Sequence, residues 1–273
     1  MGQVTIELRN LRNVSFEVDL GLEGPAYFVF GVRKSGSTLL NLIATALARL
    51  NGRRIVAVGD TFFNHNVPAI DWQYDPALAE IIHPGNIYVG CRDMPFALLG
   101  TPLFDQSPKI LIVRDPRDAL VSEFFSNAYS HTIPRPTGES SAVTDVLERE
   151  RNSALTTGID AYVVQRSQEM VRTILEFGAI AKSSTTTLVK YEDYIFKKRD
   201  LVELVANHFG WKVDENAMAD ILRRFDVRPT AEDPRAFVRK VTPGDHREKL
   251  QPATIMKLNA FVRRAMRLLD YSE

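Results

Sequence analysis

This chain has almost no cysteine and no long apolar run. Its 273 residues include one cysteine, Cys91, which excludes an intramolecular disulfide and fits a reducing compartment. No segment approaches the run of about 20 apolar residues that crosses a membrane. The charged, alternating start of the chain also lacks the apolar stretch of a signal peptide. We therefore expect a cytoplasmic protein without a membrane span.

The sequence also lacks an excess of charge of either sign. Its 34 Lys and Arg residues balance its 34 Asp and Glu residues, so the net charge gives no reason to expect nucleic acid or an anionic membrane as a partner. No cluster of residues has the spacing of metal ligands, and we expect no metal. Any anion site must therefore come from a local group of cations.

Short apolar runs alternate with helical patterns along the chain. The runs that we expect to be strands are 26–31, 54–58, 86–90, 109–113 and 186–190. The clearest helical patterns lie at 38–50, 158–177 and 200–209. Strands that alternate with helices predict an α/β fold, with a central parallel sheet flanked by helices, and we expect one domain over residues 1–273.

Two segments depart from this alternation of strands and helices. Residues 3–19 alternate apolar and polar side chains, which predicts an antiparallel strand pair within residues 1–24. Residues 131–157 are rich in Ser, Thr, Pro and Gly, and they suggest a surface excursion or lid. Beyond about residue 212 the chain indicates helices and loops only.

A glycine turn joins the first apolar run to a helix. Gly31 and Gly36 have the spacing of the NTPase P-loop, G-x-x-x-x-G-K-[ST]. Ser37 stands where that motif has its lysine, and Lys34 lies inside the loop instead. Gly36 lets the backbone approach a phosphate closely, and the free N–H groups of a helix start favour an anion. The segment predicts an anion-binding loop in which the lysine occupies a different position from that of the NTPase lysine.

A second motif follows the apolar run at 109–113. Arg114 ends that run, at the edge where α/β sheets bind ligands. Asp115 and Pro116 suit the start of a helix. Ser122 lies eight residues after Arg114, about two helical turns on, and could face the same ligand. An NTPase would need an Asp for magnesium at the end of such a strand, so Arg114 argues against one.

Both motifs resemble those of the PAPS-dependent sulfotransferases, whose donor is 3′-phosphoadenosine-5′-phosphosulfate (PAPS). The loop resembles the family sequences P-K-S-G-T-T-W and R-K-G-G-T, and the segment after the fourth run matches R-[ND]-P-x-D followed by a Ser. The resemblance implies a P-loop-NTPase-like sulfotransferase architecture, with adenosine 3′,5′-bisphosphate (PAP) as product. It implies that the phosphosulfate is bound by Arg33, Lys34, Ser35, Gly36, Ser37 and Thr38, and the 3′-phosphate by Arg114 and Ser122.

The resemblance extends to two positions that would contact adenine. Residues 188–193 resemble the Y-E-D segment of the family, in which Tyr191 would contact the base. Phe225 falls where the family often has an aromatic ring against adenine, and a place in the core is equally open for it. Leu39 departs from the cytosolic branch, which has a Trp there that stacks on adenine.

A fourth match lies near the C-terminus. Residues 237–247 resemble F-x-R-K-G-x-x-G-D-W-K, which implies that Arg239 and Lys240 clamp the 3′-phosphate from its other side. Val241 replaces a Gly of that motif and His246 replaces its Trp. The family's dimer motif is not recognisable further on, so no dimer of that kind is expected and the oligomeric state stays open.

Three residues are candidates for the general base that takes the proton of the acceptor. Asp60 ranks first, because the heparan-type and protein-tyrosine branches use a Glu just after the second strand. Asp93 ranks second, near the position of the His in the cytosolic K-T-H-x-P motif, and His65 ranks third. A carboxylate with an ordinary pKa of about 3.9 is a weak base, so burial would have to raise its pKa.

The four matches predict in-line, metal-independent transfer of a sulfuryl group from PAPS to a hydroxyl or amine, with Lys34 neutralising the leaving oxygen. The acceptor would be a small molecule, a glycan or a lipid, and the sequence does not identify it. Two alternatives stay open at this point. One is a nucleotide-dependent kinase with a degenerate P-loop, and the other is a non-catalytic PAPS-binding module.

Overall fold

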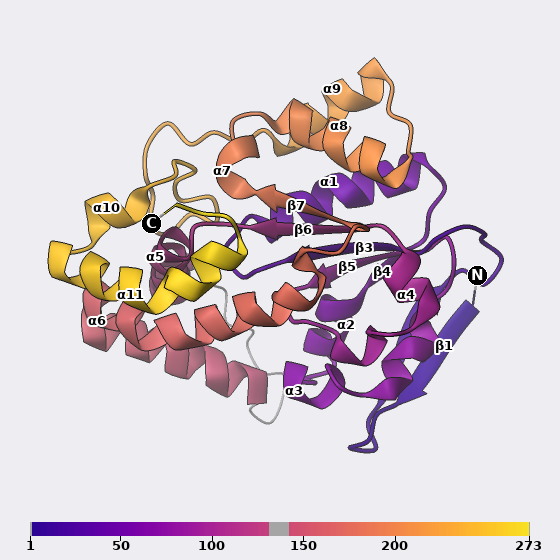
Figure 1. Cartoon of the computed structure of the whole chain (residues 1–273), viewed down its shortest axis with the longest axis horizontal. Coiled ribbons are helices and arrows are strands. Elements are labelled where there is room, and N and C mark those ends of the chain that lie inside the picture. The colour runs from indigo at the N-terminus through magenta and orange to yellow at the C-terminus, as the bar shows by residue number, and fades with distance from the viewer. Residues whose placement is uncertain (1, 131–141, 273) are drawn as a thin grey trace. The chain divides into compact units, whose positions relative to one another are not determined.

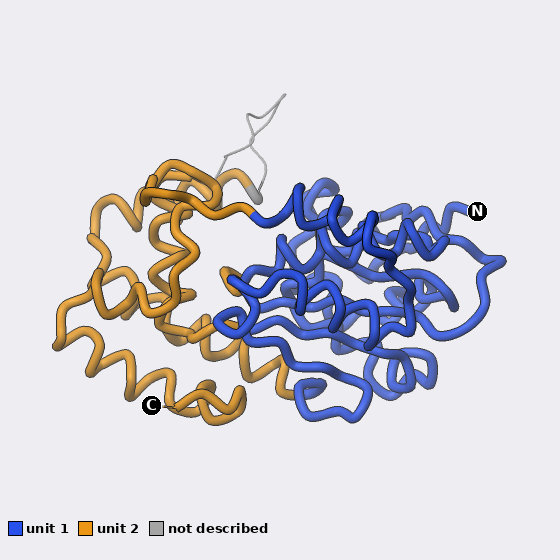
Figure 2. Tube along the Cα trace, turned by 90° about the horizontal axis from the view of Figure 1, so that it is seen from above, with its two compact units in different colours: residues 1–32, 36–113, 179–226 blue, residues 33–35, 114–178, 227–273 orange. Residues whose placement is uncertain are grey.

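The computed structural model of the chain describes residues 2–130 and 142–272. These residues form two compact units, which Figure 2 shows in different colours. The first unit contains residues 1–32, 36–113 and 179–226, and the second contains residues 33–35, 114–178 and 227–273. The expectation of one domain over the whole chain stays a prediction.

A five-stranded parallel sheet forms the centre of the first unit (Figure 1). Its strands are β3 (Tyr27–Gly31), β4 (Ile55–Ala57), β5 (Ile87–Cys91), β6 (Lys109–Val113) and β7 (Thr186–Lys190). Their order across the sheet is β4-β5-β3-β6-β7, and every neighbouring pair is parallel. The α/β fold with a central parallel sheet flanked by helices is therefore confirmed.

Helices cover one face of this sheet. They are α1 (Ser37–Leu50), α8 (Lys198–Phe209) and α9 (Glu215–Phe225). Alternate strand side chains, among them Val29, Ile110 and Val189, pack against these helices in one hydrophobic cluster. Because the opposite face is buried too, the strands carry apolar residues at successive positions, which is the pattern of a parallel sheet covered on both sides.

Aromatic rings fill much of the opposite face. The ring of Phe28 stacks on Tyr88 at 5.1 Å and meets the edge of Phe104 at 4.8 Å between ring centroids. Phe104 belongs to α4 (Pro102–Gln106). The remaining short elements of the first unit are α2 (Val58–Asn64), α3 (Ala69–Trp72), η1 (Pro76–Ile81), η2 (Phe96–Leu98) and α7 (Tyr191–Tyr194).

A separate strand pair begins the chain, as the alternation over residues 3–19 predicts. Strands β1 (Gly2–Glu7) and β2 (Asn13–Val18) run antiparallel. Phe16 of β2 packs edge-on against Phe62 of α2, which in turn stacks on Trp72. The strand pair therefore supports helix α2, which carries Asp60.

Helices make up the second unit. They are α5 (Pro116–Phe125), η3 (Ser126–Ser130), α6 (Ala142–Ala181, whose last residues belong to the first unit), α10 (Asp245–Lys249) and α11 (Pro252–Leu268). Helix α6 is interrupted at Gly158, where φ is 73°. Within the described residues, no helix has both the length and the apolar character needed to cross a membrane.

The segment expected to be a lid divides into two parts. Residues 131–141 lie outside the described residues, while residues 142–157 form the first part of α6. The second part is rich in Ala, Leu, Glu and Arg, which favour a helix. The composition of 131–157 as a whole hid this helix, and the lid stays a prediction.

Candidate functional site

The residues singled out from the sequence follow the strands directly along the chain. Lys34 comes after β3, Asp60 after β4, Asp93 after β5, Arg114 after β6 and Tyr191 after β7. The first connection runs from β3 to β4 on one side, whereas β6 lies on the other side of β3. The chain thus changes direction at β3 and β6, and ligands of α/β sheets bind outside the carboxyl ends of the strands at such a point.

Two glycines shape the turn between β3 and α1. A Cβ on Gly31 would lie 2.5 Å from the Cβ of Ser37. Gly36 has a φ of 87°, and a Cβ there would lie 2.9 Å from Cδ2 of Tyr191. Any side chain at Gly36 would therefore be strained and would meet the ring. The structure brings the predicted adenine-contacting tyrosine directly against the predicted phosphate loop.

The start of α1 carries a cation that the motif comparison missed. Ser37 is the first residue of this helix and is buried. The side chain of Arg92, which follows β5, donates from Nε to the hydroxyl of Ser37 at 3.5 Å. A guanidinium at this helix start adds to the partial positive charge of the helix dipole, which favours an anion. The one available signal was an Arg directly after a strand.

The second unit holds the part of the loop that contains Lys34. Lys34 has a φ of 63°, which is uncommon for a residue with a side chain. Its main-chain oxygen accepts a hydrogen bond of 3.5 Å from Nη1 of Arg114. Ser35 and Arg114 are both buried. The loop expected to hold the phosphosulfate and the arginine expected to hold the 3′-phosphate are therefore joined within one unit.

Asp118 connects the two segments that are expected to hold the 3′-phosphate. It accepts hydrogen bonds from the main-chain N–H groups of Gly244 (2.6 Å) and His246 (3.0 Å), and from Nδ1 of His246 (2.6 Å). It also lies 3.9 Å from Arg114. Burial alone would raise the pKa of Asp118, but His246 and Arg114 outweigh it and lower the pKa to about 2. His246 thus fixes the C-terminal segment to helix α5.

The cations of the C-terminal segment are held by carboxylates. Arg239 binds Glu232 and Asp245, and its guanidinium lies 4.1 Å from the centre of the Phe125 ring. Lys240 binds Asp245 at 3.1 Å and Glu248 at 2.6 Å. A phosphate that reached either cation would compete with these carboxylates. The expected clamp on the 3′-phosphate stays a prediction.

Ser122 and Phe225, two further residues expected to contact the nucleotide, differ in their surroundings. Ser122 lies in α5 and is partly exposed, two turns after Arg114. Asp115 caps the same helix, because its side chain accepts from the main-chain N–H of Arg117 at 2.9 Å, as expected. Phe225 ends α9 and packs against the hydrophobic cluster under the sheet. Its place is thus in contact with the core, and its contact with adenine stays a prediction.

The two carboxylates proposed as bases lie near one another around Cys91. Asp60 lies in the first turn of α2, and its Cγ is 3.8 Å from the position that a Cβ of Gly90 would take. Burial raises the pKa of the Cys91 thiol to about 12, with further contributions from Asp93 and Asp60. Both carboxylates therefore lie close enough to act electrostatically on one thiol, although neither is buried.

The third candidate base, His65, lies at the opposite end of α2. Its Nδ1 lies 2.9 Å from the main-chain oxygen of Thr61. Because a carbonyl oxygen only accepts, Nδ1 must donate, and the side chain is exposed. The structure thus places His65 at the other end of α2 from Asp60, and its role as a base stays a prediction.

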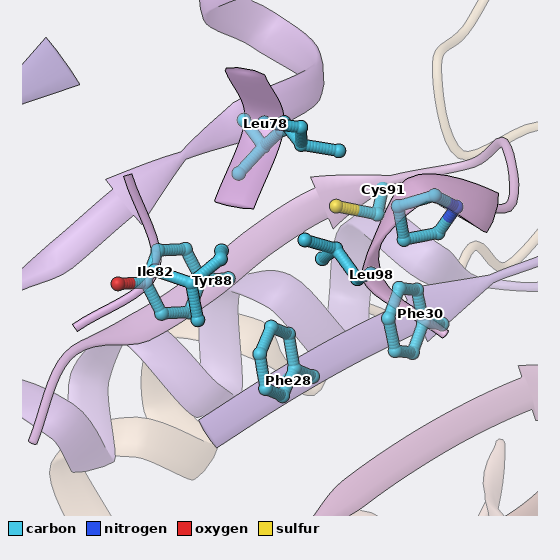
Figure 3. A pocket seen from close by; sticks show the side chains of 9 residues that line it. Phe28, Phe30, Leu78, Ile82, Tyr88, Cys91 and Leu98 are labelled. Atoms are coloured by element: carbon cyan, nitrogen blue, oxygen red, sulfur yellow. The ribbon is translucent and has the colours of Figure 1, made fainter. Parts of the chain in front are cut away.

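A small apolar cavity reaches the same strand end (Figure 3). It is lined by Phe28, Phe30, Val58, Leu78, Ile82, Tyr88, Cys91, Pro95 and Leu98. Cys91 is thus one of the side chains that line this apolar space. In the ranges 2–130 and 142–272, no group of three or more His, Cys, Asp or Glu side chains is arranged to hold a metal ion.

Comparison with known proteins shows which family and which structures the chain is similar to. The family model for the sulfotransferase domain matches residues 25–270. The structure of mouse sulfotransferase SULT7A1 complexed with PAP has a TM-score of 0.61 at 15% identity, over 90% of this chain and 86% of its own. No curated protein sequence matches the chain.

Two structures of retinol dehydratase are also similar. The complex with androsterone and PAP has a TM-score of 0.52, over 93% of this chain and 83% of its own, at 15% identity. The complex with retinol and PAP has a TM-score of 0.51, over 93% and 84%, also at 15% identity. At this identity the likeness shows the shared fold alone.

Proposed function

This chain belongs to the sulfotransferase domain family and transfers sulfuryl groups, and we propose that its donor is PAPS and its acceptor group a hydroxyl or an amine. One observation carries the proposal. The guanidinium of Arg114 donates to the main-chain oxygen of Lys34, and this contact supports the proposal that one nucleotide with a phosphate at each end binds to both residues. An Arg and a phosphate form a charge-assisted, often bidentate pair.

The reaction proposed is an in-line displacement at sulfur. The acceptor oxygen or nitrogen forms a bond to sulfur while the bond from sulfur to the bridging phosphate oxygen breaks. The proton of the acceptor passes to a base, and PAP leaves. Lys34 stabilises the charge that grows on the leaving oxygen, which is the kind of electrostatic stabilisation that enzymes use most. These steps need no metal.

Asp60 and Asp93 remain the candidates for the base. Each follows a strand of the sheet, and both act on the Cys91 thiol. We rank Asp60 first because it lies in the first turn of α2, and this helix begins directly after strand β4. A base in this position would contribute about 10²–10⁴-fold to the rate.

The acceptor proposed is a small molecule with an apolar part. One retinol dehydratase structure holds androsterone and the other holds retinol, which are both largely apolar small molecules, and this supports the choice. A glycan or lipid with a small apolar group stays within the proposal.

Calorimetry with PAP and with ADP tests the donor. We expect PAP to bind without magnesium and ADP to bind much more weakly, because ADP lacks the 3′-phosphate that Arg114 would hold. Labelled PAPS with a panel of phenols, aliphatic alcohols and amines then tests transfer. Equal binding of ADP and PAP, or ADP binding that needs magnesium, would contradict the proposal and favour a kinase. Binding of PAP with no transfer to any acceptor of the panel would favour a binding module.

A further inference from the structure

A chain of alternating charges in the second unit leads from the phosphate loop to helix α5. Its members are Arg33, Glu169, Arg166, Glu123 and Glu150. Arg33 precedes Lys34 in the loop, and Glu123 follows Ser122 in α5. The chain thus begins beside one predicted phosphate ligand and ends beside another, although the motif comparison assigned none of the three glutamates or Arg166.

The contacts within this chain are direct. The guanidinium of Arg33 binds the carboxylate of Glu169. Arg166 binds the other oxygen of Glu169 at 2.6 Å, Glu123 at 2.8 Å and Glu150 at 3.0 Å. Arg166 is therefore in contact with carboxylates from α5 and from both sides of the Gly158 interruption in α6.

Two neutral side chains complete the network. The hydroxyl of Tyr162 donates to Glu123 at 3.2 Å, and the amide of Asn127 donates to Tyr162 at 2.8 Å and to Glu150 at 3.1 Å. Networks of this kind restrict their members more than isolated surface pairs do, because each group has several partners. The network gives α5, α6 and the loop one shared set of contacts.

The charges of the network hold Arg33 in place. Burial would lower the pKa of Arg33, but Glu123 and Glu169 raise it above its usual value. Burial alone would raise the pKa of Glu169, whereas Arg33 and Arg166 lower it. Both members of the pair are thus stabilised as ions, and the exposed fractions of their side chains are 30% and 33%.

We propose that Arg33 is a positioning residue: its pairing with Glu169, and through Arg166 with Glu123, holds the loop of Lys34 in register with α5. This inference rests on the proposed function. It differs from the role that the sequence resemblance implies, in which Arg33 binds the phosphosulfate itself. In the role proposed, Arg33 acts on the sulfuryl group through the backbone that it shares with Lys34.

A double-mutant cycle separates the two roles of Arg33. The variants are Arg33→Met, Glu169→Gln and the double variant, each assayed for kcat at saturating PAPS and for the Kd of PAP. We expect each single variant to lower kcat by about ten- to a hundredfold through misplacement of Lys34. The double variant should lose no more kcat than the worse single variant, because both changes break the same Arg33–Glu169 pair. The Kd of PAP should change less than about twofold.

The controls use the same part of the chain. Arg149→Met removes an exposed guanidinium from α6, whose Nε donates to the main-chain oxygen of Asp145 at 3.2 Å, and should leave kcat unchanged. Arg33→Lys should restore part of the lost kcat, because a lysine can still reach Glu169 with a single bond. If Arg33→Met fails to fold, Arg33→Lys and Glu169→Gln form the cycle instead, and coupled losses of kcat between them support the proposal.

Several results would overturn the inference. A Kd of PAP raised about tenfold in Arg33→Met but normal in Glu169→Gln would make Arg33 a ligand. Fully additive losses of kcat, or normal kcat in Glu169→Gln, would show that the pair does not act through Lys34. Failure of the wild-type protein to bind PAP would instead reject the proposed function, so that the two failures are distinguishable.

Discussion

The guanidinium of Arg114 donates to the main-chain oxygen of Lys34 at 3.5 Å, although the two residues are 80 positions apart in the chain. The contact uses the backbone of Lys34. It therefore stabilises the conformation of the loop and does not depend on which side chain position 34 carries. Arg114 also lies 3.9 Å from Asp118, which holds the segment before α10. One buried cation therefore links the three segments that the sequence motifs identify separately.

Replacement of Lys34 by Ala should abolish transfer while the fold persists. The contact from Arg114 to the carbonyl remains in this variant, and only the ammonium group is lost. Loss of such electrostatic stabilisation typically costs about 10²–10³ in kcat. The measurement is kcat with labelled PAPS, together with a thermal melt that compares the variant with the wild type. Turnover at the wild-type rate would remove Lys34 from the mechanism.

Replacement of Arg114 by Ala should weaken the binding of PAP. A hydrogen bond to a charged group contributes about 1.5–3 kcal/mol, so Kd should rise by roughly ten- to a hundredfold. Calorimetry measures this change, with Arg223→Ala as control because Arg223 is an exposed guanidinium paired only with Asp220 among the ion pairs seen in the described residues. An unchanged Kd would place the 3′-phosphate elsewhere.

Replacement of the base should reduce kcat and leave PAP binding intact. We expect Asp60→Asn to lower kcat by about 10²–10⁴-fold, because the amide cannot accept the proton. Asp93→Asn should have a smaller effect, and His65→Gln should have none, since His65 lies at the far end of α2. The dependence of kcat on pH in each variant measures this. A large loss in Asp93→Asn with normal Asp60→Asn would reverse the ranking.

Asp118 should make the stability of the protein depend on pH in the acid range. Its pKa falls from the ordinary 3.8 to about 2 on folding, so its stabilisation is complete above pH 3.8 and is lost as the pH falls through 2. The shift corresponds to roughly 2 kcal/mol. We therefore expect Asp118→Asn to lower the free energy of unfolding by at least that amount at pH 7.

The comparison of wild type and Asp118→Asn by denaturant unfolding isolates this group from the other carboxylates. The difference between the two free energies should shrink as the pH falls from 4 toward 2, because the wild-type carboxylate becomes protonated. A difference that stays constant over this interval would show that the variant acts through lost packing instead of through the charge.

The local elements and the motifs within them could be predicted from the amino-acid sequence. The run at 109–113 coincides with β6, because a strand buried on both faces needs apolar residues at nearly every position. The run at 186–190 coincides with β7, an edge strand that is rich in the β-branched residues typical of strands. The sequence also predicts the loop with Gly31 and Gly36 and the capped start of α5, because turns and caps depend on residues only a few positions apart. The resemblance of these motifs was enough to indicate the family.

The contacts between distant side chains, in contrast, became known only from the folded chain. The contact of His246 with Asp118 spans 128 positions, that of Arg33 with Glu169 spans 136, and that of Arg92 with Ser37 spans 55. The spacing of residues along a chain does not predict such contacts. They depend on the order of the strands in the sheet and on how the connecting helices pack. The helix over residues 142–157 was missed for a different reason: its helix-favouring residues were averaged with the Ser-, Thr-, Pro- and Gly-rich residues that precede them.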